Sequence, residues 1–227
     1  MKLSVIIPVY NEVRTIAHIL AKVQATPHDK EILIIDDFST DGTREFLQKN
    51  TDENVHVFYQ KTNQGKGAAL KLGFEKAQGD IIIIQDADLE YDPDDYKELI
   101  SPIVKGLADV VYGSRFLGGR PQRSHFILNK LGNRFLTLLS NFMFNHTLSD
   151  MNTCYKAFQR ELLPKLNLKC DGFAFDAEFT AKVCKLNLRI YEVPIVYHGR
   201  NVEEGKKLRL SHGFGHLWAL IKYRFTN

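Results

Sequence analysis

Apolar runs of strand length alternate with amphipathic stretches of helix length along the first half of the chain. This alternation is typical of β-α-β units arranged around a mainly parallel sheet. Because the apolar runs are rich in β-branched residues, we expect strands that are buried on both faces. The predicted strands are residues 3–9, 31–35, 55–59, 81–84 and 109–112. The predicted helices are residues 12–23, 43–49, 67–77 and 93–104.

The second half of the chain has a less regular pattern. Residues 126–144 have helical spacing and end in an apolar run, and residues 188–196 have the pattern of one more strand. No internal repeat or low-complexity linker divides the 227 residues. We therefore predict a single α/β domain.

Charge and cysteine content exclude several classes of protein. The 30 basic residues nearly balance the 27 acidic ones, and a net charge of +3 does not favour a nucleic-acid partner. The three cysteines form no C-x-x-C pair, so neither a disulfide framework nor a thiolate zinc site is expected, and a reducing cytoplasm fits best. His212 and His216 are four residues apart and could lie on one face of a helix, but the sequence offers no third ligand to complete a zinc site.

The apolar run at the N-terminus is too short for a secretory signal and is interrupted by Pro8. No segment approaches the roughly 20 apolar residues that span a bilayer. These features predict a cytoplasmic protein whose membrane contact, if any, is peripheral. Two apolar segments are candidates for such contact, residues 135–144 and the stripe near the C-terminus; packing against the domain is the alternative for both. The C-terminal stripe consists of Leu217, Trp218, Leu220, Ile221 and Phe225.

Acidic residues follow three of the predicted strands directly. Glu12 follows the first strand, Asp36 and Asp37 the second, and Asp86, Asp88 and Glu90 the fourth. In open parallel sheets, ligands bind at the carboxyl ends of the strands, so these side chains are expected to meet in one crevice. An Asp-x-Asp pair beyond a buried strand is costly unless a cation compensates it, and hard carboxylate oxygens suit Mg²⁺ or Mn²⁺. An Asp-x-Asp alone is weak evidence, and its place after residues 81–84 strengthens it.

Two loops have both a structural and a ligand-binding interpretation. Ser39 or Asp41 is expected to shape the turn before Thr43, while Asp37 faces the crevice and accepts hydrogen bonds from a nucleobase. Residues 63–67, Asn-Gln-Gly-Lys-Gly, permit close backbone approach to a phosphate near a helix start, with Lys66 as the charge. They match neither a Walker A loop nor a dinucleotide fingerprint.

Taken in order, these motifs resemble those of the inverting family 2 glycosyltransferases of GT-A fold, and among them the dolichol- or polyprenyl-phosphate mannosyl and glucosyl transferases. The resemblance covers nearly the whole chain. It rests on Val5-Ile-Ile-Pro-Val-Tyr-Asn-Glu12, Ile35-Asp-Asp-Phe-Ser-Thr-Asp-Gly-Thr43, Asn63-Gln-Gly-Lys-Gly67, Asp86-Ala-Asp88, Gly113-Ser-Arg115, and Arg200 with Gly205-Lys206.

The resemblance implies a role for each matching position. A donor half, residues 1–115, would bind a nucleotide-sugar such as GDP-mannose or UDP-glucose, and an acceptor half, residues 116–227, would carry the C-terminal amphipathic segment. Donor-site residues would be Pro8, Tyr10, Glu12, Asp37, Lys66, Asp86, Ala87, Asp88, Arg200 and Lys206. The metal and the diphosphate would be organised by Asp86, Asp88 and Glu90, although relatives often carry Gln at the third position.

The acceptor side is expected in the acid-free stretch between Asp109 and Asp150, which is rich in arginine and lysine; a solvated basic helix face is the alternative. Arg115 and Arg123 match family positions that aim a lipid phosphate at the sugar. Such a phosphate is largely ionised near neutrality and needs no general base, whereas a hydroxyl acceptor needs one. Asp176 is the retained candidate for a base or positioning residue, with Asp150 and Glu178 also available.

The expected activity is therefore hexose transfer to polyprenyl or dolichyl phosphate, with Asp88, Arg115, Arg123 and Asp176 as catalytic candidates. Three alternatives stay open. The same donor chemistry can serve a saccharide or other hydroxyl acceptor. A nucleotidyltransferase also brings acids to strand ends, but its glycine-rich N-terminal loop is missing. A non-catalytic sugar-nucleotide binding protein would not need the intact charged set.

Overall fold

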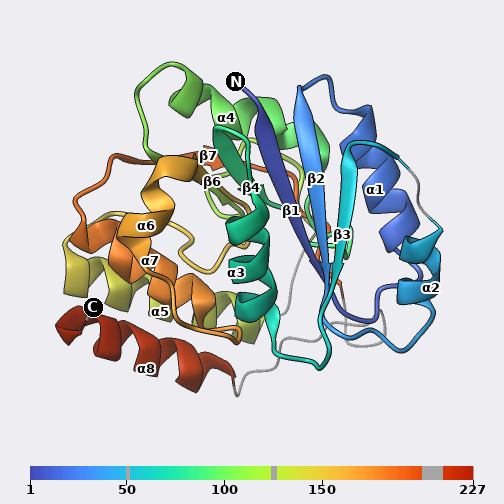
Figure 1. Cartoon of the computed structure of the whole chain (residues 1–227). Coiled ribbons are helices and arrows are strands. Elements are labelled where there is room, and N and C mark those ends of the chain that lie inside the picture. The colour runs from blue at the N-terminus through green and yellow to red at the C-terminus, as the bar shows by residue number, and fades with distance from the viewer. Residues whose placement is uncertain (50–51, 124–126, 201–211, 227) are drawn as a thin grey trace.

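The computed structural model describes residues 1–49, 52–123, 127–200 and 212–226. In this part of the chain, seven strands form one sheet in the order β3-β2-β1-β4-β6-β5-β7 (Figure 1). The strands are β1 (Leu3–Val9), β2 (Lys30–Asp36), β3 (Val55–Tyr59), β4 (Ile81–Ile84), β5 (Val110–Ser114), β6 (Lys156–Gln159) and β7 (Ile190–Pro194). Only β6 runs antiparallel to its neighbours among these strands. The predicted α/β class with a mainly parallel sheet is confirmed.

Helices cover both faces of this sheet. Side chains alternate along each strand, so Val5 and Ile7 of β1 face one core while Ile6 faces the other. On the first face lie α1 (Ile16–Ala25), α2 (Thr43–Gln48) and α4 (Tyr96–Val104). On the second face lie α3 (Lys66–Lys76), α6 (Leu163–Leu166) and α7 (Phe175–Lys185). Short 3-10 turns precede α4, at Pro93–Asp95, and α6, at Arg160–Leu162.

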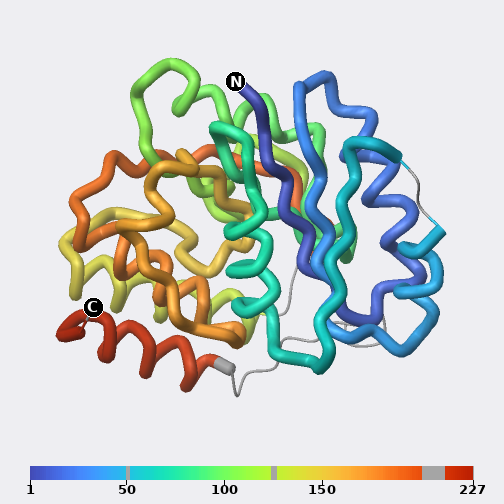
Figure 2. Tube along the Cα trace, viewed as in Figure 1, coloured from blue at the N-terminus to red at the C-terminus, as the bar shows by residue number. Residues whose placement is uncertain are grey.

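Two more helices form a third cluster beside α7. The inner faces of α5 (Ile127–Phe144) and α8 (His212–Phe225) pack with α7 around Leu136, Ala181 and Leu220. The tube trace follows α8 along the outside of the molecule, at the end farthest from α1 and α2 (Figure 2). Among the described helices, none combines the length and the apolar character needed to cross a bilayer.

The differences from the predicted elements have local causes. Helix α1 begins at Ile16 instead of residue 12: Asn11 has a positive φ of 50°, and residues 13–15 form a turn in which the Thr15 N–H donates to the Glu12 carbonyl. The sequence pattern missed β6 and α7. Helix α7 buries Asp176, Glu178 and Lys182, so its inward face does not read as apolar.

Candidate active site

A cavity of about 430 Å³ opens at the carboxyl ends of β1, β2 and β4. These strands run parallel, so the loops that follow them meet at one edge of the sheet. The cavity is lined by twelve of the predicted site residues: Pro8, Tyr10, Glu12, Asp37, Lys66, Asp86, Ala87, Asp88, Glu90, Arg115, Asp176 and Arg200. Lys206 lies outside the described residues, and Arg123 lies outside the described lining of the cavity.

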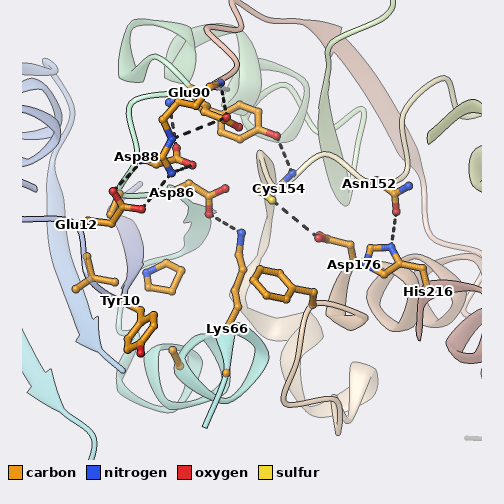
Figure 3. Close-up of a pocket in the computed structure, with 18 of the residues that line it drawn as sticks. Tyr10, Glu12, Lys66, Asp86, Asp88, Glu90, Asn152, Cys154, Asp176 and His216 are labelled. Carbon is orange, nitrogen blue, oxygen red and sulfur yellow. Dashed lines mark hydrogen bonds and ion pairs between the residues drawn. The ribbon is translucent and has the colours of Figure 1, made fainter. Parts of the chain in front are cut away.

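Asp86 forms an ion pair with Lys66, whose side chain points across the cavity from the first residue of α3 (Figure 3). The Lys66 Nζ lies 2.5 Å from Asp86 Oδ1. Burial alone would raise the pKa of Asp86, but the Lys66 charge and hydrogen bond outweigh it and the pKa is lowered. Burial would also lower the pKa of Lys66, yet the Asp86 charge raises it well above its ordinary value. Both groups are therefore charged at neutral pH.

Asp88 lies beside a second cation, Arg200. The Arg200 Nη2 donates to Asp88 Oδ2 at 2.9 Å, and the same guanidinium holds both oxygens of Glu12 at 3.0 and 3.1 Å. Burial, followed by repulsion from Asp86 and Glu90, raises the pKa of Asp88 to about 7 despite the Arg200 charge. This crowding of carboxylates favours any additional positive charge at Asp88.

Glu90 fixes the late segment of the chain onto this cluster. Its Oε2 accepts from the Tyr197 hydroxyl at 2.7 Å, and its Oε1 accepts from the Arg200 backbone N–H at 2.7 Å. Residues that are far apart in sequence are thereby held at one wall of the cavity.

The donor set of the acidic cluster fits a hard divalent cation. Asp86 and Asp88 supply carboxylate oxygens within the cavity, the ligand type that Mg²⁺ and Mn²⁺ prefer. Within the described residues, no three histidine, cysteine or acidic side chains converge as a ready metal cage. Asp86, Asp88 and Glu90 thus do not form a closed three-ligand site. An Mg²⁺-type ion bound by one or two carboxylates and a substrate phosphate needs no such cage.

Asp37 lines the cavity and pins the loop that precedes α3. Its two oxygens accept from the backbone N–H groups of Gln64 and Gly65 at 2.7 and 2.8 Å. Burial raises the pKa of Asp37, and these two hydrogen bonds oppose part of that rise. The neighbouring turn is shaped as predicted, because Asp41 accepts from the Thr43 N–H and hydroxyl.

The two glycines beside Lys66 allow close backbone packing. A Cβ on Gly65 would lie 2.5 Å from the Asp171 carbonyl oxygen, and one on Gly67 would lie 2.2 Å from the Cys170 carbonyl oxygen. Gly65 also has a φ of 96°, in the region that favours glycine. The glycines therefore allow the start of α3 to pack against the backbone of residues 170–171, and this packing fixes the position of Lys66.

The two predicted acceptor arginines lie in different environments. Arg115 is buried and forms a bidentate pair with Asp150, with both N···O distances 2.7 Å. Its guanidinium also lies 5.2 Å from the centre of the Tyr197 ring. Arg123 is exposed and donates to the Gly199 carbonyl at 3.2 Å. Of the two, only Arg115 belongs to the described lining of the cavity.

Asp176 lies at the cavity wall and is paired with a buried lysine. The fully buried Lys156 Nζ lies 2.5 Å from Asp176 Oδ1 and also donates to the Thr153 carbonyl. The Cys154 Sγ lies 3.9 Å from the other oxygen of Asp176. The Asp176 carboxylate is thus engaged on both sides by neighbouring groups of the chain.

The far end of the cavity contains a polar chain that the sequence did not indicate. Asn152 donates to Asn133 of α5 at 3.0 Å, and its Oδ1 lies 2.8 Å from the His216 Nδ1 of α8. Figure 3 shows His216 and Asn152 on the side of Asp176 away from Asp86. The three residues come from separate segments without a shared motif, so no local pattern could have grouped them. Tyr197 was findable, because it closely follows the last predicted strand.

The sequence profile of the family described as Glycosyl transferase family 2 matches residues 4–166, which contain the strand ends and the acidic cluster just described. The chain belongs to glycosyltransferase family 2. The predicted family is therefore confirmed, and the cavity lies at the carboxyl ends of the strands, where open α/β sheets bind their ligands.

Curated family 2 relatives resemble most of the chain. Glycosyltransferase AglJ of Haloferax volcanii is 32% identical over 197 residues, which are 86% of this chain and 63% of that protein. The chain therefore spans less than two thirds of the length of AglJ. Undecaprenyl-phosphate mannosyltransferase of Micrococcus luteus is 28% identical over 214 residues, 91% of this chain and 87% of that protein. Polyprenol monophosphomannose synthase of Mycolicibacterium smegmatis is 29% identical over 215 residues, 89% and 79% respectively.

A solved structure supports the fold. Glucosyl-3-phosphoglycerate synthase of Mycobacterium tuberculosis, in complex with Mn²⁺, UDP and phosphoglyceric acid, superposes with a TM-score of 0.77 at 18% identity, covering 100% of this chain and 79% of that one. This likeness confirms the GT-A architecture that the resemblance implied. It carries no information on the acceptor of this family 2 member.

Proposed function

We propose that this family 2 glycosyltransferase moves a hexose from a nucleoside diphosphate sugar to a polyprenyl or dolichyl phosphate, with inversion and with Mg²⁺ or Mn²⁺ as cofactor. One observation carries the proposal: a single cavity joins the acidic pair and its two cations to the buried Arg115. Two relatives are named for transfer to, or synthesis of, polyprenyl phosphate sugars, which supports this acceptor class.

In this proposal residues 1–115 form the donor half. Pro8, Tyr10 and Asp37 line the part of the cavity that would receive the base and ribose. Bound at Asp86 and Asp88, a divalent cation would neutralise charge on the departing diphosphate. Lys66 and Arg200 supply further positive charge at the same place, and Glu90 positions Arg200 instead of acting as a ligand. Lys206 stays a candidate for closing over the donor.

The acceptor half, residues 116–227, would present an anionic nucleophile. Asp176 is already paired with Lys156, and a carboxylate engaged in this way is poorly placed to remove a proton from a hydroxyl. A phosphate monoester is largely ionised near neutrality and needs no such base. Arg115, held in place by its bidentate pair with Asp150, is our candidate for hydrogen bonding to this phosphate, and Arg123 stays a candidate outside the described lining. An acceptor of this kind places the enzyme at the cytoplasmic surface of a membrane.

The donor and metal are tested together by a transfer assay. Purified protein is incubated with Mn²⁺, a short polyprenyl phosphate and labelled GDP-mannose, UDP-glucose or UDP-GlcNAc, and label is counted in the organic phase. Asp86→Asn combined with Asp88→Asn should lower transfer by at least about 100-fold, because the diphosphate loses its compensating charge. The exposed pair Glu53→Gln and Asp94→Asn is the matched control and should transfer normally. Full activity of the Asp86/Asp88 variant would contradict the proposal.

The acceptor class is tested by comparing Arg115→Met with Asp176→Asn. A lipid phosphate acceptor requires that Arg115→Met raise the KM for the polyprenyl phosphate, with donor binding retained. Asp176→Asn should keep measurable transfer, because no base is needed. Stabilisation by nucleotide and Mn²⁺ in a thermal unfolding assay checks that each variant is folded. Complete loss of turnover in a folded Asp176→Asn variant, with Arg115→Met unaffected, would favour a hydroxyl acceptor instead.

A further inference from the structure

Helix α5 presents a row of large apolar side chains to solvent. The row repeats with spacings of three and four residues, the period that keeps side chains on one face of a helix. It consists of Leu128, Leu131, Phe135, Leu138 and Phe142, which are between 55% and 87% exposed. The opposite face of the same helix packs inward through Leu136, Thr137 and Ser140. The outer row therefore has no role in the core of the domain.

Helix α8 carries a second row with the same spacing. Phe214, Trp218, Ile221 and Phe225 are between 41% and 82% exposed. Its inner face is occupied by Ala219, Leu220 and Tyr223, which pack with α5 and α7. We call the two rows together the outer apolar face.

The two helices are neighbours, so the rows belong to one region of the surface. The inner sides of both contribute to one apolar cluster, and the Arg224 guanidinium of α8 lies 5.8 Å from the centre of the Phe144 ring of α5. Figure 1 shows α8 along the outside of the molecule with α5 close by. Large apolar side chains exposed in rows on two neighbouring helices are typical of an interaction surface.

The exposed charges on α5 and α8 themselves have one sign. No Asp or Glu occurs between Asp109 and Asp150, and none follows Glu204 to the end of the chain. Lys130 and Arg134 are exposed on α5, and Lys222 and Arg224 are exposed on α8. An apolar helix face flanked by basic residues and free of acids suits an anionic lipid surface. A second copy of the chain would set the same cations against one another without a compensating acid.

We propose that the outer apolar face of α5 and α8 docks onto the surface of an anionic bilayer, with both helices lying in the plane of the interface. The inner sides of these helices line the far end of the cavity through Asn129, Asn133, Gly213 and His216. Docking therefore brings the lipid surface to the side of the cavity that lies beyond Asp176. The choice of a membrane as the setting rests on the proposed function, but the binding itself is measurable without donor or acceptor.

Trp218 provides a direct probe, because it is the chain's one tryptophan and lies in the outer apolar face. The purified protein is titrated with vesicles made of equal parts of phosphatidylcholine and phosphatidylglycerol, and with vesicles of phosphatidylcholine alone. Trp218 emission should shift to shorter wavelength with the anionic vesicles, and binding should weaken at high salt. Neutral vesicles should bind far less.

A pair of double variants distinguishes binding through this face from non-specific hydrophobic binding. Phe142→Ser with Phe225→Ser removes one aromatic ring from each row and should weaken vesicle binding by about tenfold or more. Val104→Ser with Leu107→Ser is the matched control: the two residues are 53% and 48% exposed at the end of α4, away from α8. The control should bind vesicles as the unmodified chain does.

Three results would overturn the inference. The first is an unshifted Trp218 emission with anionic vesicles, and the second is unchanged vesicle binding by the Phe142/Phe225 variant. The third is an unmodified chain that does not bind vesicles but forms a dimer, which the Phe142/Phe225 variant converts to a monomer. The last result assigns the face to a second copy. The Asp86/Asp88 variant should still bind vesicles, so failure of the transfer reaction and failure of docking are distinguished within the same set of proteins.

Discussion

Glu31 is a buried carboxylate that ties together three segments at the amino end of the sheet. Its Oε1 accepts from the Ser4 hydroxyl and from the backbone N–H groups of Gln78 and Gly79. Burial alone would raise the pKa of Glu31, but these hydrogen bonds outweigh it and hold the pKa below its ordinary value of 4.5. The ionised form is thus the one that stabilises the fold.

We predict that Glu31→Ala lowers the free energy of unfolding at pH 7 by at least about 2 kcal/mol, because Ser4 and Gln78 lose this acceptor and the Gly79 N–H keeps only the Ser4 hydroxyl. Since the pKa of Glu31 is lower in the folded state, its contribution is complete above pH 4.5 and is lost as the pH falls through the folded value. Urea unfolding at pH 7 and near pH 3 measures both effects. The variant should show a smaller loss of stability on acidification than the unmodified chain; equal losses would contradict the assignment.

Lys156 is a buried basic residue at the start of β6 that depends on a single carboxylate partner. It is fully buried, and its ammonium is held by Asp176 and the Thr153 carbonyl. We predict that Lys156→Met costs about 3–5 kcal/mol, because it leaves the Asp176 carboxylate buried without its partner. Lys156→Met combined with Asp176→Leu should recover much of that loss. Chemical denaturation of the three variants gives the coupling energy, and a double variant as unstable as the sum of the singles would rule out a paired role.

At the scale of elements, the start of α3 depends on the absence of a side chain at position 67. A Cβ there would meet the carbonyl oxygen and carbon of the Cys170 backbone, which cannot rotate away as a side chain can. Relief requires α3 to move, and with it Lys66. The ion pair to Asp86 therefore depends on this contact between two backbones.

We predict that Gly67→Ala both destabilises the domain and lowers transfer, with the KM for the donor rising as Lys66 is displaced. Gly215→Ala is the matched control: a Cβ there makes only an ordinary contact, 3.9 Å from Ala174. In helix α8 this control should raise stability by up to about 1 kcal/mol. Thermal unfolding and donor titration of both variants check the prediction. Unchanged stability and donor KM in Gly67→Ala would show that this backbone contact does not fix the position of α3.

Elements could be predicted where the apolar pattern decides the structure. The bounds of β1, β3 and β4 match the predicted ranges, because each is an apolar or β-branched run between polar loops. Helix α7 was missed because its buried face contains Asp176, Glu178 and Lys182. Glu178 and Lys182 pair with each other and Asp176 pairs with Lys156, so these charged residues are buried where the apolar pattern expects none. Strand β6 was missed for the same reason, since its first residue is the buried Lys156.

The residues of the site likewise fall into those that the sequence could predict and those that it could not. The strand-end rule brought Glu12, Asp37, Asp86 and Asp88 to one cavity from the sequence alone. It gave no information on which acid pairs with which cation, because those choices depend on distances between segments. The chain of Asn133, Asn152 and His216 lies in two helices and a loop and could be recognised only in three dimensions.

At the scale of the whole molecule, ion pairs at the cavity join an early segment of the chain to a late one. Arg200 links Glu12 after β1 to Asp88 after β4, across 188 and 112 residues of sequence. Glu90 binds the same late segment through Tyr197 and the Arg200 backbone. The acidic cluster is therefore both the proposed metal site and the group that holds Tyr197 and Arg200 in place.

This double role predicts how the whole chain responds to its ligands. Mn²⁺ bound together with a nucleoside diphosphate would place the metal's positive charge where Asp86, Asp88 and Glu90 repel one another, so the pair should stabilise the folded chain. At about 100 times the dissociation constant the gain is about 2.7 kcal/mol, or roughly 5–10 °C in the unfolding midpoint. We expect UDP or GDP without Mn²⁺ to give a clearly smaller shift.

The Asp86→Asn and Asp88→Asn double variant separates the two roles. Without ligand it should fold but be less stable than the unmodified chain, because Lys66 loses the partner of its ion pair. Relief of the repulsion that raises the pKa of Asp88 offsets part of that loss, and Glu12 and Glu90 still hold Arg200. With nucleotide it should lose the part of the shift that depends on Mn²⁺. Differential scanning fluorimetry with each nucleotide, with and without Mn²⁺, measures this directly. A metal-dependent shift that survives in the double variant would place the cation elsewhere in the molecule and would leave the acidic cluster only the role of holding Tyr197 and Arg200 in place.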